Sequence, residues 1–214
     1  SKREMARDQA EVMSALGIEK FAVVGHDRGA RVGHRLARDH RQRVTQLCTL
    51  DICPTLDMYE TTDMGFAAAY YHWFFLIQPA DYPERMIGHD PEFYLEKKLK
   101  FLADGTAITP EAMAEYKRCF AMKETIHATC EDYRAAATID LEHDRADREQ
   151  LLDIPIHALW GEKGIIGRFY EPLAVWQRYT TGEVTGSAVP SGHYIPEEVP
   201  GRLVEELKDF LGSE

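Results

Sequence analysis

Residues 21–24, together with the turn that follows them, constrain the fold of this chain more than any other feature. The four consecutive apolar residues indicate a buried strand, and Gly25 and Gly29, two positions on either side of Asp27, indicate a sharp turn into a helix. We expect both glycines to be required, because a side chain at either position would clash with the neighbouring backbone. The turn would raise Asp27 out of the sheet and into a pocket. A carboxylate there can attack carbon directly, without a base to remove a proton first.

Strand-like and helix-like segments alternate along most of the chain, and this alternation is typical of a parallel sheet covered by helices. Apolar residues recur at helical spacing before the first strand, and Gly17 is a natural end for that helix. In chain order we expect a helix at residues 2–16, the strand at 21–24, a helix to about residue 38, strands at 44–50 and 154–160, a helix near 170–179, a strand near 187–189 and a last helix between Pro200 and Gly212. The sequence therefore predicts a fold of the α/β class.

The strand pattern is interrupted over residues 54–148, where methionine, aromatic and charged residues recur at mostly helical spacing. We interpret this block as a helical cap inserted into the core. Residues 1–53 would then form the first part of the core, with the turn and its helix, and residues 149–214 the second part.

Composition places the chain among globular proteins and excludes several classes of function. With 44% hydrophobic and 29% charged residues, the 214 residues suit one soluble domain with a substantial core. The net charge of −11 argues against a nucleic-acid partner and leaves the capture of any anion to a local cluster of cations. No apolar run approaches the ~20 residues of a membrane helix, so we expect no membrane partner.

The four cysteines and nine histidines give no sign of a metal site. The cysteines show neither a CxxC pair nor zinc spacing, which favours reduced thiols in a cytoplasmic protein. His26 precedes Asp27 in the turn, and we expect it to pack or to bond the backbone. No metal, nucleotide or flavin signature is present in the sequence, so we expect no cofactor.

Three titratable residues occupy positions suited to hydrolytic catalysis. Asp27 is at the turn, Asp51 ends the second strand, and His193 follows the last strand. Ligands bind at the carboxyl edge of a parallel sheet, where all three would lie, and the order nucleophile, acid, histidine is that of the α/β hydrolases. Taken singly, Asp51 also suits a helix cap or a turn, and His193 an ordinary loop. Glu162, after the third strand, is a minor rival for the acid.

Two arginines follow Asp27 closely. Arg28 comes directly after it and Arg31 one helical turn later, so both can face the same pocket. Their guanidiniums would keep Asp27 ionised and offer bidentate grips for a substrate carboxylate. The alternative is a solvated basic face, since Arg35 and Arg38 continue the series.

Four motifs together resemble one enzyme family. They are Gly-His-Asp-Arg-Gly-Ala-Arg at residues 25–31, the His72-Trp73 pair, Trp-Gly-Glu-Lys-Gly at 160–164 and Gly-His-Tyr at 192–194. Across nearly its whole length the chain is similar to the fluoroacetate (haloacetate) dehalogenases of the α/β-hydrolase superfamily. Epoxide hydrolases and haloalkane dehalogenases share the turn but usually have tryptophan after the aspartate, so arginine at that position is the more specific signal. The resemblance implies an α/β-hydrolase fold, of which these residues form the C-terminal part of the parallel sheet.

The resemblance also implies a mechanism on a small haloacid substrate. Asp27 would displace halide from the α-carbon of a haloacetate and leave an ester on the enzyme. His193, oriented by Asp51, would then activate water to hydrolyse that ester, and glycolate and halide would leave. The two arginines would bind the substrate carboxylate.

Donors of the family's halide pocket match His72, Trp73 and Tyr133 in this sequence. Fluoride is a poor leaving group, so such a site must stabilise charge as it develops. The alternative for the first two is ordinary packing in the aromatic run at residues 70–75, and the neighbourhood of Tyr133 has little motif content. Family members are commonly homodimers, which implies a homodimer here.

A complete hydrolase of this type carries several strands and a His-Gly loop before the turn. That loop normally provides one oxyanion donor, and the backbone N–H of Arg28 would provide the other. We therefore expect this chain to be the C-terminal portion of a longer polypeptide, with an N-terminal core segment missing. Without that segment the strand at residues 21–24 would be a sheet edge with uncovered apolar faces.

Two other functions stay open on the sequence. An epoxide hydrolase would use the same Asp27, with Tyr70, Tyr71 or Tyr133 activating the epoxide oxygen, but that leaves the two arginines without a role. A ligand-binding protein on a hydrolase scaffold would keep the pocket without turnover. Halide release separates dehalogenation from both alternatives.

Overall fold

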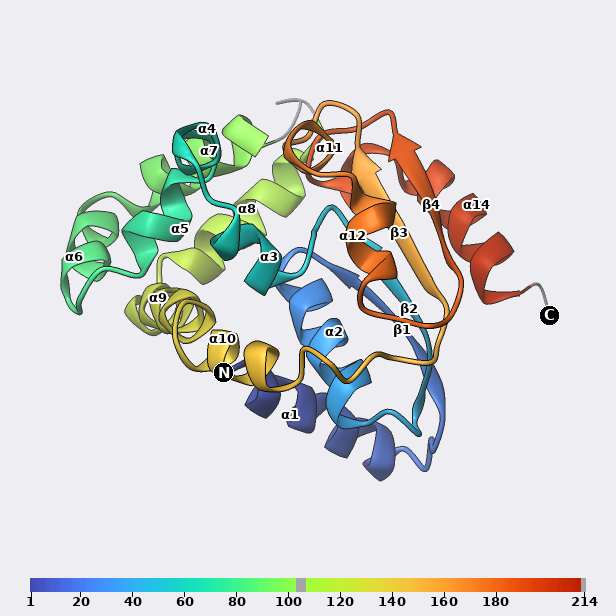
Figure 1. Cartoon of the computed structure of the whole chain (residues 1–214). Helices are drawn as coiled ribbons and strands as arrows, with labels where there is room; N and C mark the ends of the chain where they lie inside the picture. Colours follow the sequence, from blue (N-terminus) through green and yellow to red (C-terminus); the bar gives the residue numbers. More distant parts are fainter. Residues whose placement is uncertain (103–106, 213–214) are drawn as a thin grey trace.

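The computed structural model describes residues 1–102 and 107–212, with only the backbone for the last two residues before the gap, and its centre is a parallel sheet (Figure 1). The strands described are β1 (Phe21–His26), β2 (Val44–Leu50), β3 (Ile156–Gly161) and β4 (Val184–Val189). They lie side by side in chain order, and each neighbouring pair is parallel. Leu47 of β2 is opposite Val23 on one side and Ile156 on the other. Parallel neighbours require a crossover connection, so the sheet confirms the predicted α/β class.

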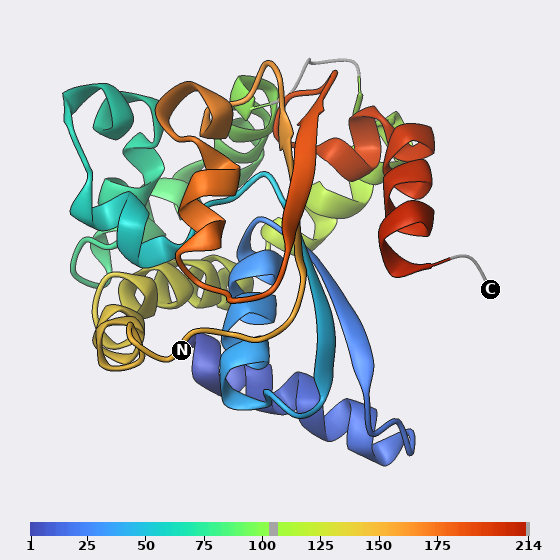
Figure 2. The ribbon, with the colours of Figure 1, turned by 45° about the vertical axis from the view of Figure 1, so that its right-hand side comes forward.

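Helices cover both faces of the sheet, and each face has its own apolar core (Figure 2). One face carries α2 (Arg28–Asp39) and α12 (Pro172–Gln177), and α1 (Lys2–Ala15) packs against α2. The other face carries α13 (Ile195–Glu198) and α14 (Pro200–Leu211). Leu47 and Cys48, adjacent in β2, belong to opposite cores because successive side chains of a strand point to opposite faces. The carboxyl ends of β2, β3 and β4 therefore lie on a part of the sheet that is packed on both faces.

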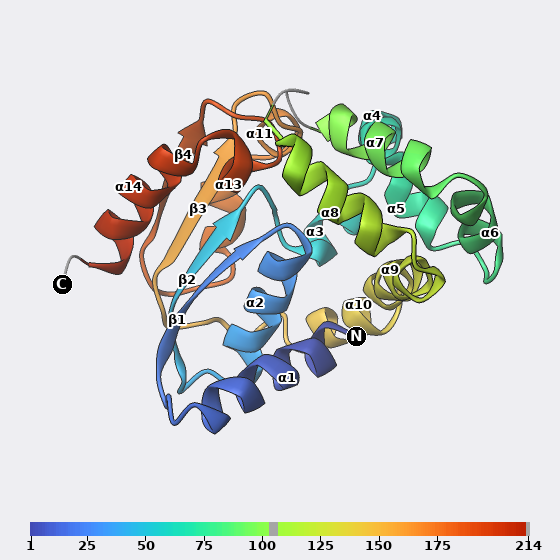
Figure 3. The ribbon, with the colours of Figure 1, turned by 180° about the vertical axis from the view of Figure 1, so that it is seen from behind.

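The long connection from β2 to β3 is helical over most of its described residues and has an aromatic core of its own; we refer to it as the cap (Figure 3). Its helices are α3 (Thr55–Glu60), α4 (Met64–Ala69), α5 (Tyr71–Leu76), α6 (Tyr82–His89), α7 (Pro91–Leu102), α8 (Pro110–Phe120), α9 (Lys123–Ala136) and α10 (Ile139–Ala146). Phe66, Trp73 and Tyr133 are buried in that core. The short helix α11 (Ile166–Phe169), which follows β3 in the chain, contributes Ile166 and Phe169 to the same core. Within the described ranges, no helix combines the length and the apolar composition that a membrane crossing requires.

Two elements differ in extent from the sequence prediction. The helix expected near 170–179 is the shorter α12. It begins at Pro172, because the first turn of a helix does not need the N–H that proline lacks. It ends at Gln177, ahead of Thr180, which forms a β-bridge with Leu152. Strand β4 begins at Val184, three residues earlier than expected. Gly186 explains the difference. A Cβ there would lie 1.8 Å from the carbonyl oxygen of Ala158, so the strand requires glycine at this position, whereas glycine in a sequence usually indicates a loop.

The outer edge of β1 is open in the described part of the chain. Val24, in the middle of this strand, is 41% exposed although it is a β-branched apolar residue. A groove of about 590 Å³ runs along β1 between α1 and α2, and its lining includes Met5, Met13 and Phe21. This edge presents unpaired backbone groups and apolar surface together.

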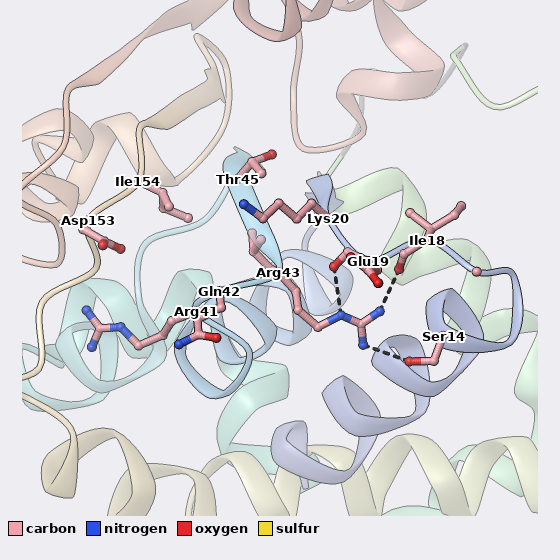
Figure 4. A pocket seen from close by; sticks show the side chains of 12 residues that line it. Ser14, Ile18, Glu19, Lys20, Arg41, Gln42, Arg43, Thr45, Asp153 and Ile154 are labelled. Atoms are coloured by element: carbon pink, nitrogen blue, oxygen red, sulfur yellow. Dashed lines mark hydrogen bonds between the residues drawn. The ribbon is translucent and has the colours of Figure 1, made fainter.

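A second hollow, of about 1050 Å³, lies at the amino ends of the strands, away from Asp27 (Figure 4). Arg43 crosses it, and its guanidinium donates to the carbonyls of Glu19 and Ile18 and to the hydroxyl of Ser14. The arginine thus ties the end of α1 to the start of β2. Its donors are used in that structural role, so the hollow does not offer an anion site through this cation.

Candidate active site

The turn between β1 and α2 holds Asp27 in a left-handed conformation, with φ of 46°. Its backbone N–H donates to the carbonyl of Leu50 at the end of β2, 3.2 Å away. A non-glycine residue in this region costs about 1–3 kcal/mol, so the surrounding fold must stabilise it. Gly25 is required as predicted, because a Cβ there would lie 2.5 Å from the Cα of Ala30. The same expectation is wrong for Gly29, where an added Cβ meets no described atom within 4 Å.

Asp51 and His193 are brought together at the carboxyl edge of the sheet. Nδ1 of His193 lies 2.6 Å from Oδ2 of Asp51, and both side chains are buried. The other oxygen of Asp51 accepts a hydrogen bond of 3.0 Å from the backbone N–H of Gly161. Glu162, the rival acid, is exposed. The geometry therefore selects Asp51 as the partner of the histidine.

The second ring nitrogen of His193 faces the turn aspartate. Nε2 of His193 lies 3.4 Å from Oδ2 of Asp27. Burial alone would lower the pKa of His193, but the hydrogen bonds and charges of Asp27 and Asp51 outweigh it and raise this pKa to about 9. Burial likewise opposes ionisation of Asp27, yet His193, Arg31 and Arg28 together hold the pKa of Asp27 well below its usual range. The resting site is thus an ionised carboxylate against a protonated imidazole.

Two further residues hold the loop that carries His193. His26 donates from Nε2 to the backbone carbonyl of His193, 2.7 Å away, and the two rings are 4.8 Å apart. This confirms the expectation that His26 bonds the backbone. Gly161 lies so close to the loop that a Cβ would be 2.0 Å from the carbonyl oxygen of Gly192. In the sequence, Gly161 is recognisable only as part of a motif, because a contact between distant segments leaves no local signal.

The two arginines lie beside Asp27, but neither offers the expected bidentate grip. Arg28 donates from Nε to Asp132 at 2.6 Å and from Nη2 to the carbonyl of the same residue at 3.0 Å. Arg31 donates from Nη1 to the carbonyl of Cys53 and to Thr55, each at 3.0 Å, and from Nη2 to Sδ of Met58 at 3.3 Å. What remains is one buried nitrogen on each, Nη1 of Arg28 and Nε of Arg31, without a partner in the described residues. Both side chains are largely buried, so the alternative of a solvated basic face is wrong for them.

The three residues assigned to halide binding form one aromatic cluster within the cap, on α5 and α9. The ring of Tyr133 lies 5.8 Å from that of His72 and 6.4 Å from that of Trp73. All three side chains are buried. Burial, and then the charge of Lys98, lowers the pKa of His72 well below its usual range, so its imidazole is neutral at neutral pH. The cluster presents polar ring atoms from α5 and α9 within a largely apolar enclosure.

Four cap or α1 residues near this site could not be recognised from the sequence. Asp132 binds Arg28 and is itself bound by Lys2 of α1. Tyr59 packs its ring 4.9 Å from that of Trp73 and has a buried hydroxyl without a partner in the described residues. Burial lowers the pKa of Lys98 to about 8, and the charges of Asp27 and Arg28 act on it in opposite directions. Only the position of Asp132 next to Tyr133 could have indicated such a role.

One group of side chains could in principle hold a cation. Ligand atoms of Glu84, His127 and Glu131 lie within 4.8 Å of one another on the cap. Arg134 already donates from Nη1 to both carboxylates at 2.6 Å. The group is therefore an ion-pair network at the surface and lies outside the candidate active site.

Comparison with known proteins agrees with this geometry. Residues 1–198 match the model of the alpha/beta hydrolase fold family, and the chain belongs to that family. It is 40% identical over 99% of its length to a fluoroacetate dehalogenase from Burkholderia sp., of which it covers 70%. It is 30% identical over 98% of its length to a soluble epoxide hydrolase from Corynebacterium sp. (strain C12), of which it covers 73%. A crystal structure assigned to the α/β hydrolases, from Nostoc sp. PCC 7120, superposes with a TM-score of 0.97 at 58% identity, over 100% of this chain and 74% of that one. The chain is therefore a hydrolase related to the dehalogenases, as the motifs implied.

Proposed function

We propose that this protein hydrolyses haloacetates, converting fluoroacetate to glycolate and fluoride. One observation carries the proposal: the carboxylate of Asp27 lies 3.4 Å from Nε2 of His193 and within the electrostatic influence of two largely buried arginines, Arg28 and Arg31. Each of those arginines keeps one nitrogen without a partner in the described residues. A small carboxylate substrate would satisfy both nitrogens while its α-carbon lies against Asp27.

In the first step, an oxygen of Asp27 attacks the α-carbon and the carbon–halogen bond breaks. The bonding electron pair leaves with the halide, and Asp27 becomes an ester of glycolate. The nucleophile is ready at neutral pH because its pKa lies well below the usual range. The ring cluster of His72, Trp73 and Tyr133 is our candidate for the halide pocket, since neutral ring N–H and O–H donors can stabilise a leaving anion.

In the second step, water attacks the carboxyl carbon of Asp27 and His193 takes its proton. Ester formation itself prepares the histidine, because it removes the Asp27 charge that helps to raise the pKa of His193. The imidazole can then lose its proton and act as a base, while Asp51 keeps the ring oriented through Nδ1. Cleavage of the ester releases glycolate and restores the carboxylate, and one proton is released per turnover.

Epoxide hydrolysis is the second candidate function, and the Corynebacterium relative supports it. It requires a phenol that can donate to the epoxide oxygen. Tyr133 is our candidate for this phenol, since it is buried beside Arg28, whose guanidinium lies 4.1 Å from its ring, whereas Tyr71 is exposed. The unpartnered nitrogens of Arg28 and Arg31 favour the haloacetate, because an epoxide has no carboxylate to pair with them.

We also propose that a further core segment pairs with the open edge of β1. The exposed Val24 and the apolar groove beside it supply the surface, and the dehalogenase relative extends well beyond the part that this chain covers.

The test is halide release from fluoroacetate and chloroacetate by the purified protein, with Asp27→Asn alongside. In a single turnover in ¹⁸O-labelled water, the label should enter the Asp27 carboxylate, because water attacks the enzyme carbon. Label found in glycolate instead would mean direct attack of water on the substrate. Diol formation from an epoxide without halide release would favour the second candidate. If the protein catalyses neither reaction, a ligand-binding role remains. Asp153→Asn is the matched control, since Asp153 is exposed and lies at the amino end of the sheet.

A further inference from the structure

The guanidinium of Arg28 is held by the cap on all but one of its nitrogens. Nε donates to Oδ2 of Asp132 at 2.6 Å, and Nη2 donates to the backbone carbonyl of Asp132 at 3.0 Å. The flat face of the guanidinium lies 4.1 Å from the ring centre of Tyr133. Only Nη1 is left, buried and without a partner in the described residues. A planar group fixed at two nitrogens and one face has no rotational freedom, so the direction of Nη1 is set by the cap.

Asp132 is held in turn by a residue from the other end of the chain. Lys2 of α1 donates from Nζ to Oδ1 of Asp132, so each carboxylate oxygen serves a different cation. The backbone N–H of Lys2 donates to Asp140 at 2.9 Å, which fixes the start of α1 against α10. Lys2, Asp132 and Asp140 are all largely buried. Buried charges are tolerated when they are paired in this way, and the loss of one partner is costly.

The alternative partner for Arg28 is the adjacent Asp27. Arg28 follows Asp27 directly, and the charge of Arg28 already acts on that carboxylate. An ion pair between them would occupy an oxygen that must attack the substrate. Within the described ranges Arg28 pairs with Asp132 instead, and the ionic partner of Asp27 is His193.

We propose that Asp132 is a positioning residue that aims Nη1 of Arg28 at the substrate carboxylate and keeps the arginine off the nucleophile. The inference rests on the proposed haloacetate reaction and goes beyond it. It assigns a cap carboxylate, outside the reacting atoms, to the binding of the substrate anion. Lys2 completes the assignment by neutralising the oxygen of Asp132 that does not face Arg28.

The test separates the Michaelis constant from the turnover number in Asp132→Asn. A charge-assisted hydrogen bond lost from the substrate carboxylate should raise KM for fluoroacetate by about 10- to 100-fold, with a smaller change in kcat. The inhibition constant of the product glycolate should rise in parallel, because it reports carboxylate binding without chemistry. Asp132→Glu keeps the charge and should recover most of the loss in KM.

The matched control is Asp140→Asn, the same chemical change at a buried carboxylate that binds Lys2 but makes no hydrogen bond or ion pair with Arg28 in the described residues. It should lower thermal stability and leave KM unchanged. If Asp132→Asn does not fold, Asp132→Glu decides through the small rise in KM that remains, because its longer side chain shifts the guanidinium of Arg28, while kcat stays nearly constant.

Two results would overturn the inference and are distinguishable. Halide release by the unmodified protein, with an unchanged KM and a reduced kcat in Asp132→Asn, would show a merely structural role. No halide release by the unmodified protein would remove the proposed function, and the positioning role with it.

Discussion

The side chains of Asp51 and His193 are joined by a hydrogen bond of 2.6 Å, although the whole cap, β3 and β4 separate them in the chain. The backbone N–H of Gly161 orients the same carboxylate from the end of β3. The ends of β2, β3 and the loop after β4 thus meet at one point, which fixes which nitrogen of His193 faces Asp27. The following predictions depend on that arrangement.

Replacing His193 with glutamine should stop the reaction after its first step. Asp27 can still attack, but no base remains to activate water, so the glycolate ester accumulates. We expect one halide released per active site followed by arrest, with turnover reduced on the order of 10⁴-fold or more. Intact-protein mass spectrometry should show one added carboxymethyl group on Asp27. Continued turnover, or no burst at all, would contradict the assignment. His127→Gln, on the cap surface, serves as the control.

The pKa of His193 should depend on the charge of Asp27. The folded protein raises this pKa from 6.5 to about 9, so we expect ring nitrogen resonances that titrate near that pH. In Asp27→Asn the pKa should fall, as it does in our account when the ester forms. Histidine-labelled NMR titration measures both values, and an identical pKa in the two proteins would disprove the coupling.

The same shift makes stability depend on pH in a defined direction. Because the folded pKa lies above the unfolded one, the stabilisation is complete below about pH 6.5 and is lost as the pH rises through about 9. Its full size is on the order of 3 kcal/mol. Urea unfolding across pH 6 to 10 measures this loss. The free energy of unfolding should decrease less with rising pH in Asp27→Asn than in the unmodified protein, and equal decreases would contradict an origin in the His193–Asp27 pair.

Gly161→Ala should destabilise the protein and displace the histidine loop. The new Cβ would lie 2.0 Å from the carbonyl oxygen of Gly192, and backbone cannot move aside as a flexible side chain can. Overpacking of this kind costs about 1–3 kcal/mol, which corresponds to a melting temperature lower on the order of 5 °C. Halide release should fall as well. Gly88→Ala is the control, because its Cβ enters open space within α6, and that change should leave the melting temperature equal or higher.

Arg31→Lys should weaken substrate binding although it preserves the charge. Lysine cannot donate to Cys53 and Thr55 while keeping a nitrogen directed at the site. We expect KM for fluoroacetate to rise by about 10-fold or more, with some loss of stability. Steady-state kinetics measure the change. Arg148→Lys, an exposed arginine on Glu60, is the control and should behave like the unmodified protein. An unchanged KM in Arg31→Lys would remove this arginine from the substrate site.

Much of the fold could be predicted because its signals are local. The apolar run before Gly25, the alternation of elements and the lack of a strand-like sequence pattern over residues 54–148 can each be read from residues that are neighbours in the chain. The placement of Asp27, Asp51 and His193 at one edge followed from a general rule of parallel sheets. The start of β4 was predicted too late because Gly186 is required by its close contact with the backbone of β3, which the local sequence does not reveal. The predicted requirement for Gly29 was wrong because the space around a turn depends on the tertiary structure.

The sequence by itself determined the sharp turn at Asp27, the α/β order of elements and the placement of Asp51 and His193 at the same sheet edge, because those depend on nearest neighbours and on chain order. Only the tertiary structure decided which donors of the two arginines stay available. Arg28 is committed to Asp132, 104 positions away, and Arg31 to the start of the cap. Hydrogen-bond partners so far apart leave no pattern in the chain, since their approach is set by the packing of the cap against the core.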